Sequence, residues 1–319
     1  MTRGTQARRE LNDLLEEAEA SHCCLLLQNE ALRGVARRYV VQGILISPYP
    51  GMFVRRSVWE EMDCAPRERW RLVQNAYKAA HPEHTLCSFS AALEYGLWVP
   101  RQELDTIHIA VPTRSHARVS THAHRHYCAP GDVSSLCGVS ITTLEKTVLD
   151  CSLEGSFEAG LAIADSAVRY MGLDLHTYRK YVAKHAGGRP GAQRARDVAR
   201  YADGGADNAG ESIVRARIIE AGFMAPTSLQ YELLDPIDSG LLRVDLYYRF
   251  SDGRELFGEI DGMEKYGEGE TVKRALVHER QRESHLTACN VPVMRILFSR
   301  INEPGYLEKL LTAYGVPRK

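Results

Sequence analysis

Three acidic residues in the last third of the chain have the spacing of a carboxylate pocket. Glu259 and Asp261 stand two residues apart, so in a strand both carboxylates point to the same side. Asp245 lies in the preceding predicted strand, at 241–248. There it alternates with apolar residues and takes the opposite face from them. These apolar residues are Val244, Leu246 and Tyr248. If the two strands pair, the three carboxylates converge, and they repel one another unless protons or cations neutralise them.

The charge around these acids changes sign along the chain. Residues 252–270 hold seven acids and two bases, whereas residues 271–300 hold six lysines and arginines and two acids. Oxygen ligands suit Mg²⁺ or Mn²⁺, the metals of phosphodiester hydrolysis, and a basic helix beside them suits a polyanionic substrate. We therefore expect Asp245, Glu259 and Asp261 to bind Mg²⁺ or Mn²⁺. The alternative is an exposed strand face that binds no metal.

A second chemical feature is an arginine-rich segment near the N-terminus, in which five arginines accompany one acid, Glu30. Asn29 is a suitable N-cap for a helix over 30–41, and two short β runs follow around the turn 48–51. With the helix expected at 11–20, this order is typical of a winged helix-turn-helix, whose helix and wing hold phosphates beside a DNA groove. The predicted DNA-binding residues are Arg33, Arg37, Arg38, Arg55 and Arg56. The alternative is a solvated arginine face on a structural helix.

Histidines and cysteines raise the question of a transition metal. In a strand over 121–128, His122, His124 and His126 would share one face. Such a row spans about 13 Å at the strand rise, too far for one ion to bind all three, so we expect an exposed polar face. The eight cysteines form no C-x-x-C pair, and we expect them to be reduced and mostly buried.

The elements that must position these residues follow from hydrophobic spacing and from glycine-rich breaks. Glycine-rich stretches around a short basic helix at 192–201 place the main domain boundary within 187–210. The last part then has the order αβββαβ, which suits a small mixed sheet covered by helices. Its predicted elements are a helix at 211–221, strands at 223–232, 241–248 and 256–262, a helix at 271–288 and a strand at 291–297. In the middle part we expect helices at 67–80, 88–95 (capped by Ser88), 144–151 and 157–170, and a strand at 106–111.

Composition sets the outer limits. The chain has 319 residues, 44% hydrophobic and 25% charged, enough for two domains or more, and this excludes disorder throughout. No apolar run approaches the roughly 20 residues that a membrane helix needs, and no signal peptide is recognisable, so we expect a cytoplasmic protein with no membrane contact. The net charge of −1 gives no global preference for nucleic acid.

The order of the C-terminal motifs resembles that of the PD-(D/E)XK nuclease superfamily, in its Vsr-like branch. The matching segments are Gly210-Glu211-Ser212-x-x-Arg215, Arg243-Val244-Asp245, Gly258-Glu259-Ile260-Asp261-Gly262 with Lys265-Tyr266, Glu279-Arg280-Gln281-Arg282-Glu283-x-x-Leu286, and Val291-Pro292-Val293-Met294-Arg295. The resemblance implies that Asp245 and Glu259 are the principal metal ligands and that Glu211 is a further acid. Asp261 stands where the superfamily carries its catalytic lysine. Lys265, Gln281 or Arg282 would take over that role.

The first two-thirds of the chain resembles the AbiEi family of type IV antitoxins and related regulators. The matching segments are Gly43-Ile44-Leu45, Gly51-Met52-Phe53-Val54, Leu86-Cys87-Ser88-x-x-Ala91-Ala92-x-x-Tyr95-Gly96-Leu97, Ile107-His108-Ile109-Ala110-Val111-Pro112 and Ile141-Thr142-Thr143-x-x-x-Thr147-Val148-Leu149-Asp150. The resemblance implies a winged helix-turn-helix that binds operator DNA, followed by an α/β antitoxin-type domain. It also implies a nucleotidyltransferase-type toxin as partner.

Together these observations predict a multidomain α/β protein. The predicted parts are a winged helix-turn-helix at 1–62, an AbiEi-like α/β domain at 63–186, a linker region at 187–210 and a restriction-endonuclease-like domain at 211–319. The leading hypothesis is a protein that binds double-stranded DNA and whose nuclease-fold domain is, or derives from, a Mg²⁺-dependent DNA endonuclease. The alternatives are a non-catalytic repressor or antitoxin, and a purely structural protein. The oligomeric state stays open, with a homodimer on paired half-sites one option.

Overall fold

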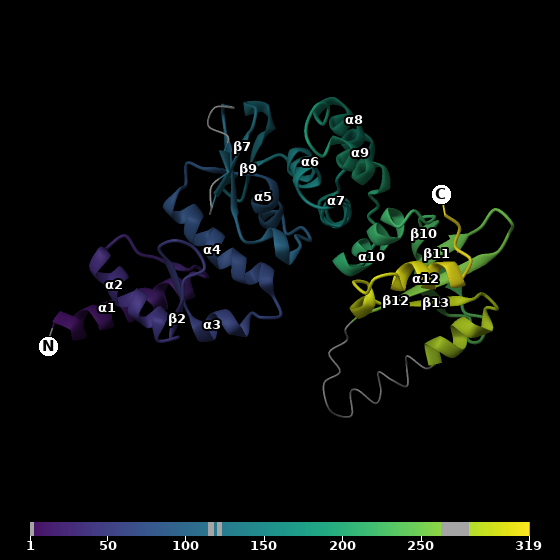
Figure 1. The fold of residues 1–319 in the computed structure, drawn as a ribbon, viewed down its shortest axis with the longest axis horizontal. Helices are drawn as coiled ribbons and strands as arrows, with labels where there is room; N and C mark the ends of the chain where they lie inside the picture. The colour runs from purple at the N-terminus through teal and green to yellow at the C-terminus, as the bar shows by residue number, and fades with distance from the viewer. Residues whose placement is uncertain (1–2, 114–117, 120–122, 263–280, 319) are drawn as a thin grey trace. The chain divides into compact units, whose positions relative to one another are not determined.

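The computed structural model describes residues 3–113, 118–119, 123–262 and 281–318. These residues form a mixed α/β structure with three separate sheets (Figure 1), so the predicted α/β class is confirmed. The chain divides into two compact units, Met1–Gly155 with Gly188–Pro190, and Ser156–Gly187 with Gly191–Lys319. The boundary after Gly155 lies inside the predicted range 63–186, and the four predicted domain ranges stay predictions. Within the described ranges, none of the helices combines the length and the hydropathy needed to span a bilayer.

The first unit begins with helices around a small antiparallel sheet of order β1-β3-β2. Its elements are α1 (Arg3–Ala20), β1 (Leu25–Leu26), α2 (Glu30–Val41), β2 (Leu45–Ile46), β3 (Met52–Arg55) and α3 (Arg56–Glu61). The side chain of Asn29 accepts hydrogen bonds from the backbone N–H groups of Ala31 and Leu32, so the predicted cap of α2 is confirmed. The inner faces of α1 and α2 pack on Phe53 of the hairpin.

The rest of the first unit is built on a six-stranded sheet of order β6-β7-β5-β4-β9-β8. Its elements are α4 (Pro66–Ala80), β4 (Thr85–Leu86), α5 (Ser88–Glu94), β5 (Ile107–Val111), β6 (Arg118–Val119), β7 (Ala123–Tyr127), β8 (Val133–Leu136), β9 (Val139–Thr142) and α6 (Leu144–Glu154). The predicted cap of α5 is wrong. Ser88 is the first helical residue, with φ +47°, and its hydroxyl donates to Glu154 Oε2 at 2.9 Å rather than accepting from a helix N–H.

The second unit begins with four helices, which are followed by a four-stranded sheet of order β10-β11-β12-β13 and the helices that accompany it. Its elements are α7 (Phe157–Met171), α8 (Leu175–His185), α9 (Ala192–Tyr201), α10 (Ala209–Glu220), β10 (Ser228–Leu234), β11 (Leu241–Arg249), β12 (Glu255–Asp261), the helical residues 281–288, β13 (Val293–Leu297) and α12 (Tyr306–Ala313). The first two strand pairs are antiparallel, and β13 joins β12 in parallel. The predicted αβββαβ order is therefore present, whereas the sequence patterns did not predict α8 or α12.

One buried carboxylate joins the helices of the second unit. Asp165 on α7 is 0% exposed. It accepts hydrogen bonds from the backbone N–H of Asp203 at 2.8 Å, from Ser212 Oγ at 2.6 Å and from Arg215 Nη2 at 2.5 Å. Arg215 also donates to the carbonyl of Tyr201. Two residues of the motif Gly210-Glu211-Ser212-x-x-Arg215 thus serve to hold α10 against α7.

We expect Asp165→Ala to destabilise the second unit by about 3–5 kcal/mol, because it leaves the buried charge of Arg215 without its partner. Urea unfolding followed by circular dichroism measures this. As a control, Asp197→Ala removes a partly exposed carboxylate of α9 and should change the free energy of unfolding by less than about 0.5 kcal/mol. Equal effects of the two substitutions would contradict the role given to Asp165.

Candidate functional site

Asp245 lies where the pairing of two strands stops. The ladder between β11 and β12 runs from Arg249–Glu255 to Leu246–Gly258. Beyond the last residue pair of this ladder, a side chain takes the place of a backbone carbonyl as hydrogen-bond acceptor. Oδ2 of Asp245 accepts from the N–H of Ile260 at 2.7 Å. Gly258 allows this close approach, because a Cβ there would lie 2.9 Å from the Cβ of Leu246.

The alternation predicted around Asp245 is wrong in one respect. Leu246 and Tyr248 pack in the core with α10 and α12, but Val244 packs with Tyr247 and Phe257 in a separate cluster. The strand therefore changes face at Asp245. Facing it, Gln230 of β10 has φ +47°, a conformation that non-glycine residues rarely adopt. Such a local distortion aims side chains away from the regular pleat.

Gln230 connects two of the predicted acids. Its Nε2 donates to Glu211 Oε2 at 2.9 Å and to Asp245 Oδ1 at 3.1 Å. Burial raises the pKa of Glu211, the hydrogen bonds from Asp207 and Gln230 lower it, and the charge of Asp245 raises it again. Sequence reasoning missed Gln230, because a lone glutamine carries no motif signal. Its positive φ appears only in the structure.

Glu259 is 4% exposed, and an arginine neutralises it. Arg282, on the helical residues 281–288, donates from Nη1 to Oε2 at 2.8 Å and from Nη2 to Oε1 at 2.9 Å. Burial raises the pKa of Glu259 to about 7; Arg282 opposes this shift, and the charge of Asp245 adds to it. Asp245 and Glu259 therefore share one electrostatic environment, in which Arg282 and, more weakly, Arg295 lower the pKa of Glu259.

Asp261 has a different partner from Glu259. Its Oδ1 accepts from Arg295 Nη1 of β13 at 2.9 Å. Three groups of histidine and acidic side chains in the described ranges bring three ligand atoms within 4.8 Å of one another, and none of these groups includes Asp245, Glu259 or Asp261. The structure thus shows Asp245 and Glu259 as a pair of acids, with Arg282 bound to Glu259. Asp261 and Arg295 form a separate ion pair beside them. The predicted Lys265 lies outside the described residues.

Three of the five N-terminal arginines are engaged inside the first unit. Arg55 pairs with Glu16 and Glu19 of α1. Arg33 donates from Nε to the carbonyl of Leu27 at 2.6 Å and pairs with Glu30. Arg56 donates from Nε to the carbonyl of Gly43 at 2.6 Å and pairs with Glu60 at 3.0 Å.

Arg37 and Arg38 lie on the outer side of α2. Both are exposed, and the side chain of Arg37 is 66% accessible with its guanidinium 3.7 Å from Glu30. Long cationic side chains in such positions reach a phosphate easily, and Arg37 would give up only its exposed ion pair with Glu30. Of the five arginines, these two are the best placed to contact a polyanion, whereas Arg33, Arg55 and Arg56 also hold the local fold together.

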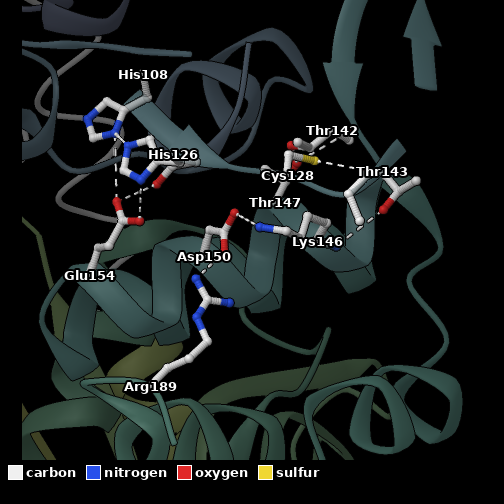
Figure 2. A network of polar contacts seen from close by, with 12 residues as sticks. His108, His126, Cys128, Thr142, Thr143, Lys146, Thr147, Asp150, Glu154 and Arg189 are labelled. Atoms are coloured by element: carbon white, nitrogen blue, oxygen red, sulfur yellow. Dashed lines mark hydrogen bonds and ion pairs between the residues drawn. The ribbon is translucent and has the colours of Figure 1, made fainter. Parts of the chain in front are cut away.

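A polar network surrounds α6 in the first unit (Figure 2). Asp150 is buried and accepts from Lys146 Nζ and from Arg189 Nη2, the latter at 3.0 Å. Thr143 caps the helix, and the hydroxyls of Thr142 and Thr147 lie 2.7 Å apart. The motif that ends at Asp150 therefore has a structural explanation. The same helix carries Glu154 beside His108 and His126.

The chain matches no protein-family model and no curated protein. The likenesses to nucleases and to antitoxins consequently stay predictions from motifs. The function of the chain therefore has to be inferred from the geometry and chemistry of its sites.

The raised pKa of Glu259 predicts a pH-dependent stability in metal-free buffer. Because its folded pKa of about 7 exceeds the ordinary 4.5, the folded chain binds more protons than the unfolded chain between these values. The stability contributed by this group is therefore fully present below about pH 4.5 and is lost as the pH rises through 7. Relative to wild type, Glu259→Gln should gain up to about 3 kcal/mol between pH 4.5 and pH 8, as measured by urea unfolding.

The pKa of Glu259 can also be measured directly, by following the nuclear magnetic resonance of its carboxyl carbon as a function of pH. Arg282→Gln removes the group that lowers this pKa, so it should move the titration of Glu259 to higher pH. A Glu259 midpoint near 4.5 in the wild-type protein would contradict the assigned burial and charge.

Proposed function

We propose that this chain binds double-stranded DNA and that its C-terminal domain is, or derives from, a Mg²⁺-dependent DNA endonuclease. The observation that carries the proposal is the acid pair Asp245 and Glu259. The two groups come from neighbouring strands, and the charge of Asp245 raises the pKa of Glu259. Placing the half-buried Asp245 beside the buried Glu259 is electrostatically unfavourable, and a divalent cation bound between the two carboxylates would remove that repulsion.

The donor chemistry of the pocket fits Mg²⁺ or Mn²⁺. Asp245 and Glu259 would hold the ion with carboxylate oxygens, the ligands that these hard cations prefer. Bound there, the ion supplies an activated water and neutralises charge on the phosphate. Glu211 lies next to Asp245 through Gln230 and would act as a further acid. Asp261 is better explained by its ion pair with Arg295 than as a third ligand.

Arg282 takes the place in this proposal that a lysine has in the superfamily pattern. Its two terminal nitrogens now bind Glu259, and one of them also donates to the carbonyl of Arg243 at 2.7 Å. A guanidinium has a planar, forked set of donors that matches a phosphate group as well as a carboxylate. In the nuclease, Arg282 would move from Glu259 to the phosphate when a metal ion binds.

The same ion pair favours a second candidate, a non-catalytic repressor or antitoxin. Glu259 already has a bidentate cation in Arg282, so the pocket is satisfied without a metal. In this case the C-terminal domain is a clamp for DNA or for a nucleotidyltransferase-type toxin. The two candidates share DNA binding by α2 and differ in whether a metal displaces Arg282.

A plasmid-nicking assay separates the candidates. With Mg²⁺ or Mn²⁺, the nuclease should convert supercoiled DNA to open circles, and Asp245→Ala or Glu259→Ala should lower the rate by at least about 100-fold. Asp252→Ala, at an exposed turn before β12, is the matched control and should retain the wild-type rate. Nicking that survives both pocket substitutions belongs to a contaminant and contradicts the nuclease. DNA binding with no nicking favours the repressor.

The DNA-binding half is tested by fluorescence anisotropy at several salt concentrations. If Arg37 and Arg38 each contact one phosphate, their double substitution by alanine should reduce the salt slope of log K by about 1.8 and weaken binding at every duplex sequence. The double variant Arg196→Ala/Arg200→Ala removes the same charge from exposed positions of α9 and should keep nearly the wild-type slope. An unchanged slope in the α2 variant would refute the assignment.

A further inference from the structure

Three histidines meet on the sheet of the first unit. β5 and β7 pair in parallel with His108 opposite His124, and His126 is two residues further along β7. One ring nitrogen from each of the three lies within 4.8 Å of the others. The row expected from the sequence, His122, His124 and His126, is too long for a single ion, and His122 lies outside the described residues. Strand pairing replaces the far end of that row with His108, so the three imidazoles gather instead of lying exposed in a line.

Glu154 fixes the orientation of one of these rings. Its Oε1 lies 3.0 Å from Nδ1 of His126, and its Oε2 accepts from the hydroxyl of Ser88. Burial would raise the pKa of Glu154, but the hydrogen bond and charge of His126 and the bond from Ser88 bring it below the ordinary value. An ionised Glu154 accepts the Nδ1 proton of His126. The other nitrogen, Nε2, then carries its lone pair toward His108 (Figure 2).

The ring of His108 is buried and uncharged, and zinc binding through its Nδ1 would require the proton that it now donates to His126 to move to its own Nε2. His108 is 4% exposed. Burial lowers its pKa to about 3, Glu154 opposes that shift, and the neighbouring histidines add to it. Its ring is therefore neutral at physiological pH, and its Nδ1 lies 2.9 Å from Nε2 of His126. His126, whose Nδ1 is held by Glu154, has the usual arrangement of a histidine ligand, whereas Nδ1 of His108 faces both His126 and, at 3.7 Å, Glu154.

The cluster opens into a cavity of about 490 Å³ that is lined by all three histidines and Glu154. Such a cavity gives an ion a path to the ring nitrogens and leaves room for a water or a small ligand as a further donor. Asp105, Glu103 and Arg189 also line it. Arg189 is paired with Asp150, so the acids leave the lining with a negative charge that favours a cation over an anion.

We propose that His108, His124 and His126 bind one Zn²⁺ ion, with Glu154 orienting His126 and the remaining coordination position facing the cavity. Three nitrogen ligands and one open position are a common zinc arrangement. In a tetrahedral site with bonds of about 2.0–2.1 Å, ligand nitrogens lie about 3.3 Å apart. The observed separations, 2.9 Å for His108 and His126 and at most 4.8 Å within the group, reach this value by side-chain shifts of roughly 1.5 Å or less.

This site is independent of the proposed function. Its nitrogen ligands suit zinc and related late transition metals, whereas the carboxylates of the second unit suit Mg²⁺. Millimolar Mg²⁺ should therefore not compete for it.

The test uses the full-length chain, stripped of metal and titrated with Zn²⁺ by calorimetry in the presence of Mg²⁺. We expect one Zn²⁺ per chain. Co²⁺ in its place should give the strong visible absorption of a four-coordinate site. His124→Ala and His126→Ala should each weaken Zn²⁺ binding by at least about 100-fold, and Glu154→Gln by about 10–100-fold.

Two control variants test whether the other histidine-containing groups of the described ranges bind Zn²⁺. His285→Ala disrupts the group with Asp235 and Asp238, and His84→Ala disrupts the group with His81 and Glu83. Both should bind Zn²⁺ like wild type. Thermal melting without metal shows whether each variant folds. His124 is substituted instead of His108 because it is only half-buried, so its replacement disturbs the fold less. Absence of Zn²⁺ binding by the wild-type chain, or its loss only in a control variant, overturns the proposal.

Discussion

A carboxylate that is buried away from water needs a cation or several hydrogen-bond donors as partners, and this constraint organises both units. Asp165 meets Arg215, Asp150 meets Lys146, and Glu259 meets Arg282. An unpaired charge in a low-dielectric interior costs several kcal/mol, so each such acid selects which helix can pack beside it. The helices of the second unit are joined through Asp165 and its donors in this way, in addition to their apolar contacts.

The same constraint frames the functional question in the second unit. Glu259 carries a bidentate arginine and still has a raised pKa, because burial and Asp245 outweigh that partner. A protein that needed Glu259 only for structure would have no use for a second acid beside it. A nuclease would use both acids for a metal ion. A repressor would keep Arg282 bound to Glu259. The two functions therefore differ in whether Glu259 binds a metal ion or Arg282.

The motifs behind the family resemblances divide into those the fold explains and those it does not. Ser212 and Arg215 hold two helices together, and Asp150 serves a buried network around α6. Asp245 and Gln230 are different, since a strand changes face and a glutamine adopts a positive φ to bring them together. Local strain without a packing benefit is more typical of a site than of a scaffold.

The sequence by itself determined the local features. Hydrophobic spacing and the Asn29 side chain define α2, the glycine-rich breaks define α9, and the αβββαβ order follows from the alternation of apolar runs. Only the tertiary structure decided which distant groups meet. It paired Arg282 with Glu259, turned Asp261 to Arg295, and placed His108 against the histidines of β7. The physical reason is that periodicity fixes the face on which a side chain lies, whereas strand register and helix packing fix its neighbours.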